Sequence, residues 1–135
     1  MTRRTIPMTL LALLLGASAA LAAGAQPAPQ STAELKTAIG SKKTPVIVFF
    51  MNPYGMPCNA QNAILLDLQE ARKKDFQIAY VRTDRPADQQ AFYDYGVRSL
   101  PALVLVSRGG LIKRVFPPGI QKADILGAAL DGVRD

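Results

Sequence analysis

The chain has 135 residues, a formal net charge of +6 and one cysteine, and it contains no histidine. The missing histidine excludes Cys-His and Ser-His-Asp catalysis. Together with the single cysteine, it also makes a structural zinc site untenable, and we expect neither a bound metal nor a cofactor.

The first 22 residues have the pattern of a secretory signal peptide. Arg3 and Arg4 form a basic start, residues 10–15 are a short apolar core, and 20–22 (Ala-Leu-Ala) form a small-x-small cleavage site. An uncleaved membrane anchor is the alternative, but the apolar stretch is short for a spanning helix. We therefore predict export to a bacterial periplasm, with no stable membrane insertion after cleavage.

Removal of the signal peptide leaves about 110 residues, which suits one compact domain. We divide the chain into a signal peptide at 1–22, a linker at 23–30 and a folded domain at 31–135. Bases are spread along the domain, and its aromatic residues lie mostly in apolar runs. We interpret the positive charge as ordinary solvated surface and expect no nucleic-acid partner.

Helices and strands alternate along the predicted domain. Ser31-Thr32-Ala33-Glu34 is a capping box that opens a helix ending at Gly40. Residues 45–51 form a nearly all-apolar strand, as in strands buried on both faces. Further helices are predicted at 57–74, at 83–95 and at the C-terminus, and further strands at 76–81, 102–106 and 111–116. This order predicts an α/β fold with a mixed four-stranded sheet and helices on both faces.

Two helices carry apolar stripes that predict their buried faces. In the helix at 57–74 the stripe consists of Ala60, Ile64, Leu68 and Ala71. In the last helix it consists of Leu126, Ala129, Leu130 and Val133. Asp84 and Asp88 are interpreted as helix-start residues rather than as a catalytic pair.

Residues 52–58, Asn-Pro-Tyr-Gly-Met-Pro-Cys, directly follow the buried strand at 45–51. A tight turn with Pro57 at the first helical position places Cys58 near a helix N-terminus. Cys-x-x-Cys dithiols work in this setting, but Gly55 occupies the first cysteine position. Because Cys58 is the only thiol, it cannot form an internal disulfide.

Segments 49–58 and 95–106 resemble, in this order, the Cys-x-x-Cys segment and the cis-proline segment of the thioredoxin family. The resemblance implies a thioredoxin-like fold, with Cys58 in the place of the second, resolving thiol. It makes Cys58 the candidate catalytic residue and implies a cis bond before Pro101. The motif and polypeptide-binding surface would consist of Tyr54, Gly55, Met56, Pro57, Leu100 and Pro101.

Two functions remain open within the thiol–disulfide oxidoreductase family, and neither includes autonomous dithiol turnover. In the first, Cys58 exchanges as a monothiol with a redox partner protein. In the second, the domain is redox-inactive and binds or chaperones another exported polypeptide, with Cys58 a buried, unreactive side chain. A Cu(I) carrier using Met51, Met56 and Cys58 is a further alternative, because thioether and thiolate ligands suit Cu(I).

Overall fold

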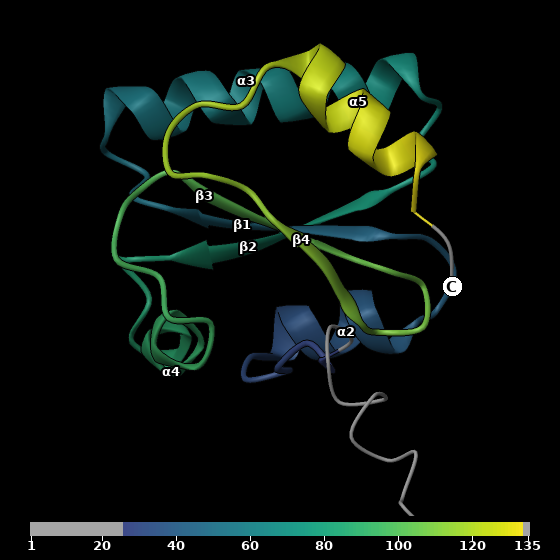
Figure 1. Cartoon of the computed structure of the whole chain (residues 1–135). Helices are drawn as coiled ribbons and strands as arrows, with labels where there is room; N and C mark the ends of the chain where they lie inside the picture. Colours follow the sequence, from purple (N-terminus) through teal and green to yellow (C-terminus); the bar gives the residue numbers. More distant parts are fainter. Residues whose placement is uncertain (1–25, 134–135) are drawn as a thin grey trace, which may run out of the picture.

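The computed structural model describes residues 26–133 (Figure 1). The predicted signal peptide at 1–22 lies outside the described residues, as do 23–25 of the predicted linker. The elements are α2 (Ala33–Gly40), β1 (Val46–Met51), α3 (Met56–Ala71), β2 (Gln77–Arg82), η1 (Pro86–Asp88), α4 (Gln89–Asp94), β3 (Ala102–Val106), β4 (Ile112–Val115) and α5 (Ala123–Asp131).

The four strands form one mixed sheet in the order β2-β1-β3-β4, which confirms the predicted fold class. Strand β1 runs parallel to β2 and antiparallel to β3, and β4 returns antiparallel to β3. Helices α3 and α5 cover one face of the sheet, and α2 and α4 cover the other (Figure 1).

Every residue of β1 is buried, because this central strand supplies both hydrophobic cores. Successive side chains of a strand point to opposite faces of the sheet. Val46, Val48 and Phe50 accordingly belong to the core under α2 and α4. Ile47, Phe49 and Met51 belong to the core under α3 and α5.

The first helix is capped differently from the prediction. Thr32, rather than Ser31, is the N-cap, and its hydroxyl accepts a hydrogen bond from the Leu35 N–H at 3.1 Å. Glu34 does not close a capping box, because its carboxylate accepts a hydrogen bond from the backbone N–H of Tyr80 in β2. A partner from a distant part of the chain thus takes the side chain that a local rule assigns to the cap.

Residues 26–30, which the sequence analysis places in a linker, pack against the start of β4. The Ala28 N–H donates to the Gly110 carbonyl at 2.8 Å, and the Ile112 N–H donates to the Gln26 carbonyl at 2.8 Å. The side chain of Ala28 is buried in the core under α2 and α4. The packed domain therefore extends to Gln26, because these main-chain groups satisfy those of the β3–β4 hairpin.

The predicted stripe of helix α3 is correct only in part, since Ile64 and Leu68 pack against the core. Ala60 and Ala71 are exposed, whereas Cys58, Gln61 and Leu65 are buried. The stripe predicted for α5 is correct, since Leu126 and Leu130 are buried against the same core. Among the described residues, no helix combines the length and the apolarity that crossing a bilayer requires.

The misassigned face of α3 follows from Gln61, a fully buried polar residue. Its side-chain amide donates to the Gln121 carbonyl at 3.1 Å and accepts from the Gln121 N–H at 2.6 Å. Gln121 precedes α5, so this pair of bonds fastens the segment between β4 and α5 to α3. An apolar pattern assigns glutamine to solvent and therefore misses such a position.

The region predicted as one helix at 83–95 forms two shorter elements, η1 and α4. Neither has a side-chain hydrogen bond at its N-cap. The carboxylate of Asp88 is buried and accepts instead from the Arg82 N–H at 2.8 Å, with Arg85 at 3.6 Å. Asp88 therefore satisfies the end of β2 rather than a helix N-terminus.

We predict that Gln61→Leu destabilises the domain by about 1–3 kcal/mol, because it leaves the Gln121 N–H and carbonyl without their partners. The measurement is the free energy of unfolding from urea titration. Gln90→Leu is the matched control, since Gln90 is exposed and donates to an exposed carboxylate. Equal stabilities of the two variants would contradict the role given to Gln61.

Candidate functional site

The candidate site lies where β1 ends and the chain turns into α3. Asn52 organises this turn, because its carbonyl accepts from the Gly55 N–H at 3.0 Å and its side-chain oxygen accepts from the Tyr54 N–H at 3.1 Å. The Gly55 carbonyl in turn accepts from the Asn59 N–H at 3.0 Å, which starts the helix. The turn is thus held by its own main chain and by one asparagine side chain.

Cys58 lies beneath this turn and is a free cysteine with 3 % of its surface exposed. It belongs to the core that contains Met51 and Leu103. The backbone N–H of Asn52 donates to Sγ at 3.4 Å. The thiol is therefore held inside the fold, and a reagent in solvent reaches it only when the turn opens.

Gly55, at the first cysteine position of the motif, has an ordinary extended backbone with φ −93° and ψ 133°. A Cβ atom built there would come no closer than 3.5 Å to the Asn52 carbonyl oxygen, which is normal van der Waals contact. The backbone therefore does not require glycine at this position. The missing thiol changes the chemistry of the site and leaves its frame intact.

The exposed part of the site consists of Tyr54 and Met56, each with 81 % of its surface exposed, together with the exposed Pro57. These side chains project from the turn on either side of Gly55. Exposed large apolar side chains that are adjacent in the chain suit contact with another molecule.

The Leu100–Pro101 segment lies beside this turn because of the strand register. Phe50 pairs with Ala102, so the residues after Phe50 and those before Ala102 are neighbours. The Leu100–Pro101 peptide bond is cis. Pro101 is buried and Leu100 is half-buried, so the two support the site from below rather than extending its exposed surface.

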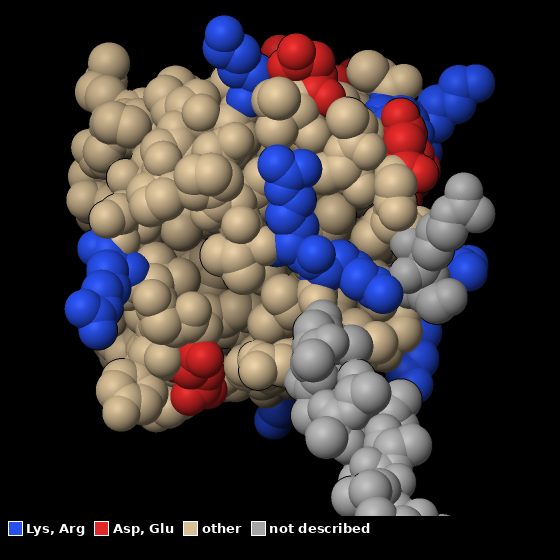
Figure 2. Space-filling view, in the orientation of Figure 1, with Lys and Arg blue, Asp and Glu red and all other residues tan. Residues whose placement is uncertain are grey.

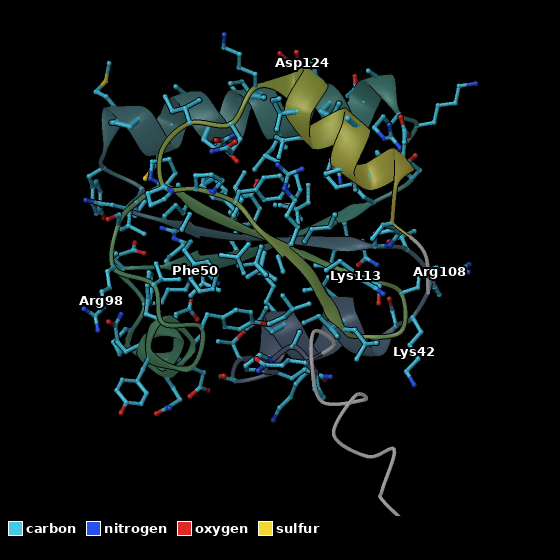
Figure 3. All side chains as sticks on the ribbon, viewed as in Figure 1. Lys42, Phe50, Arg98, Arg108, Lys113 and Asp124 are labelled. Atoms are coloured by element: carbon cyan, nitrogen blue, oxygen red, sulfur yellow. The ribbon has the colours of Figure 1, made fainter. Side chains whose placement is uncertain are left out.

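A small hollow of about 160 Å³ opens next to Leu100. Residues on both sides of the Leu100–Pro101 bond line it, among them Val97, Ser99 and Ala102. Arg98 also lines it, at the end of the molecule opposite Lys42 and Arg108 (Figure 3). The hollow has the size of one apolar side chain rather than of a cofactor.

The charged neighbours of the turn are Arg82 and Asp84. Arg82 pairs in register with Met51, and its guanidinium contacts the Asp84 carboxylate at 2.7 Å. This hydrogen bond raises the pKa of Arg82 and lowers the pKa of Asp84. Within residues 26–133 the one buried acid is Asp88. Its carboxylate already accepts a hydrogen bond from the Arg82 N–H. No buried carboxylate of the described chain is therefore left to accept a proton from Cys58.

The three sulfur atoms proposed for Cu(I) do not share one environment. Met51 and Cys58 are buried in the same core, whereas Met56 projects into solvent. The described residues also contain no cluster of three or more His, Cys, Asp and Glu side chains that could hold a metal. The sulfur arrangement does not support the copper alternative.

Sequence reasoning missed two residues that shape the site. The sequence pattern places Asn52 in the turn but does not reveal that its backbone N–H contacts Sγ of Cys58 and that its side-chain oxygen accepts from the Tyr54 N–H. Gln61 lies one helical turn after Cys58 on the same face of α3 and is buried with it. No local signal in the sequence identifies this position, because its burial depends on the hydrogen bonds to the distant Gln121.

Comparison with protein families matches the Thioredoxin family model to residues 26–130. None of the curated proteins compared with the chain matches it. Solved structures do match, and all those described below carry the same fold. The family model shows the family, and the similar solved structures support the fold.

Thioredoxin O2 from Arabidopsis thaliana, in its oxidised state, is similar with 19 % sequence identity and a TM-score of 0.62. The match covers 79 % of this chain and 92 % of the Arabidopsis chain. Trichomonas vaginalis thioredoxin is similar with 28 % identity and a TM-score of 0.59, covering 70 % and 85 %. Thioredoxin-2, a component of the malaria parasite protein secretion machinery, has 19 % identity and a TM-score of 0.55, covering 65 % and 82 %.

We predict that alkylation of Cys58 in the native protein is at least about a hundredfold slower than in urea, because the thiol reacts only through opening of the turn. Mass spectrometry of samples quenched over time measures the rate. The control is Gly55→Cys combined with Cys58→Ser, which places the single thiol on the exposed turn and should react rapidly. Native Cys58 reacting as fast as this control would contradict its burial.

Proposed function

This chain belongs to the thioredoxin family, and on that premise we propose that it is an exported protein that binds an extended segment of another exported polypeptide, without dithiol turnover of its own. The observation that carries the proposal is the state of its single thiol. Cys58 is 3 % exposed, and the half-buried Gly55 occupies the position in the turn where the family resemblance places an attacking thiol.

The electron balance of disulfide reduction supports the proposed absence of dithiol turnover. Reduction of a disulfide takes two electrons and ends with two thiols released, so a catalyst needs one thiol to attack and another to resolve the mixed disulfide. The chain contains no cysteine other than Cys58 that could resolve the mixed disulfide. Attack by Cys58 alone would end at a mixed disulfide, with the partner protein still attached.

The surroundings of the turn support polypeptide binding. Tyr54 and Met56 offer exposed apolar surface, and the hollow next to Leu100 can receive a side chain. Among the described residues, the main-chain N–H and carbonyl of Leu100 make no hydrogen bond. Free main-chain groups at the start of a strand can pair with an extended peptide, while the neighbouring apolar residues contact its side chains.

Monothiol exchange is the second candidate, and the contact between the Asn52 N–H and Sγ favours it. A hydrogen-bond donor at 3.4 Å stabilises a sulfur atom that carries negative charge. In this case the turn would open, Cys58 would form a mixed disulfide, and a thiol of a separate redox partner would release it.

Tyr54→Ala should weaken binding of an unfolded polypeptide by about fivefold or more, because exposed aromatic side chains often dominate such interfaces. The probe is reduced, carboxymethylated α-lactalbumin, which stays unfolded and has no free thiol, and fluorescence anisotropy of the labelled probe measures its Kd. Tyr93→Ala is the matched control, since Tyr93 is 84 % exposed on α4, away from the turn. Equal losses in the two variants would remove the site from this surface.

Gly55→Cys should give the protein multi-turnover reduction of insulin disulfides by dithiothreitol, and the wild type should show none. The reason is that a cysteine side chain fits at position 55 and lies near Cys58, so attack and resolution become possible. Gly55→Cys with Cys58→Ser should instead accumulate mixed disulfides. Turnover by the wild type would refute the proposed lack of dithiol chemistry.

If Gly55→Cys fails even to close an internal disulfide, the turn differs from a dithiol site in its geometry as well as in its residues. This outcome is read by mass spectrometry after oxidation and alkylation. It would favour polypeptide binding over thiol exchange as the function of the surface at Tyr54 and Met56.

A further inference from the structure

Three connections meet at the end of the sheet opposite the candidate site. Val46, the first residue of β1, pairs with Gln77 at the start of β2 and with Val106 at the end of β3. The loop before β1, the turn between α3 and β2 and the turn between β3 and β4 are therefore neighbours (Figure 1). Each of them carries basic residues.

This region, which we call the basic end, holds eight of the thirteen bases in residues 26–133 but three of the nine acids. The bases are Lys42, Lys43, Arg72, Lys73, Lys74, Arg108, Lys113 and Arg114, and the acids are Glu70, Asp75 and Asp131. Figure 3 labels Lys42, Arg108 and Lys113 on one side of the molecule and Arg98 on the other. Figure 2 shows basic side chains over β4 and toward the same side.

Two of the three acids are already neutralised. Arg72 contacts Asp75 at 3.0 Å and Asp131 at 2.9 Å. Within the described part of the chain, no ion pair forms at the lysines of the basic end, which are Lys42, Lys43, Lys73, Lys74 and Lys113. These five lysines therefore present positive charge that no ion pair within the described residues compensates, and this charge attracts anionic partners over a distance of about one Debye length.

The shape of the basic end suits a broad partner. Two open hollows of about 390 and 410 Å³ adjoin one another at Val133. Lys43 and Arg108 line the first, and Lys113 and Arg114 line the second. Long, flexible bases spread around shallow hollows fit an array of phosphate groups on a surface better than one small buried anion.

The N-terminal segment reaches the fold at the same place. Gln26 is hydrogen-bonded to Ile112, the residue before Lys113. The apolar stretch 10–15 precedes Gln26 by eleven residues, which span at most about 40 Å when fully extended. If that stretch lies in a bilayer before cleavage, the basic end is held within about this distance of the lipid headgroups.

From these observations we infer that the basic end docks on an anionic lipid surface and that the candidate site at Tyr54 and Met56 faces away from it. Lysine and arginine near an anionic bilayer each strengthen binding through the phosphate groups of the lipids. The inference does not depend on the proposed function, because it uses none of the residues of the turn.

The test compares two variants of the full chain that lose the same charge. Lys43→Gln with Lys113→Gln removes two bases from the basic end, and Lys36→Gln with Lys122→Gln removes two exposed bases elsewhere. Sedimentation with phosphatidylcholine vesicles, with and without phosphatidylglycerol, measures partitioning onto lipid. Segment 1–25 is the same in every protein, so its own lipid affinity cancels in the comparison.

We expect wild type to prefer vesicles that contain phosphatidylglycerol and to lose this preference as salt is added. The basic-end variant should partition about tenfold less onto these vesicles, while the other variant stays within twofold of wild type. Equal losses, or no preference for anionic vesicles, would overturn the inference. Binding to polyglutamate or to a single-stranded oligonucleotide without vesicle binding would replace the lipid by an acidic macromolecule.

A measurement on the unaltered protein gives an independent answer. Lysine acetylation followed by mass spectrometry should show Lys43 and Lys113 protected in the presence of phosphatidylglycerol vesicles, with Lys36 and Lys122 unprotected. Uniform acetylation of the four lysines on bound protein would show that another part of the molecule holds the lipid.

Discussion

The complete burial of β1 is the constraint on which the rest of the structure depends. Its six residues supply both hydrophobic cores, so the strand must be covered by helices on each face and paired on each edge. This arrangement fixes both ends of the strand. At Met51 the chain leaves the core and must turn at once, and at Val46 three connections are brought together. The candidate site and the basic end are the two ends of one strand.

At the site end, a turn that resembles a dithiol site carries Gly55 where the resemblance places a first thiol. The turn keeps its hydrogen bonds through Asn52, the helix still starts behind Pro57, and position 55 has room for a side chain. Cys58 remains in the core, where an apolar environment and one N–H contact surround its sulfur. The proposed polypeptide binding needs only this shape and the exposed residues around the turn, and no electron partner.

The fold brings together bases that lie far apart in the sequence. Along the described sequence the bases are spread from Lys36 to Lys122, which is the pattern of an ordinary solvated surface. The sheet register brings eight of the thirteen described bases to one end of the sheet, together with three of the nine acids. An uneven distribution of charge over the surface can orient a molecule toward an anionic partner, even though the bases form no cluster in the sequence.

The sequence by itself determined the fold class, the buried strand that ends at Met51 and the presence of a single thiol, because these depend on local apolar runs and on residue identity. It also placed the apolar stripe of α5. Only the tertiary structure decided the inward face of α3, the partner of Glu34 and the packing of residues 26–30, since each depends on a hydrogen bond to a distant main-chain group. Polar side chains such as Gln61 are buried where a distant main-chain group can form a hydrogen bond with them. No local sequence pattern predicts the position of that group.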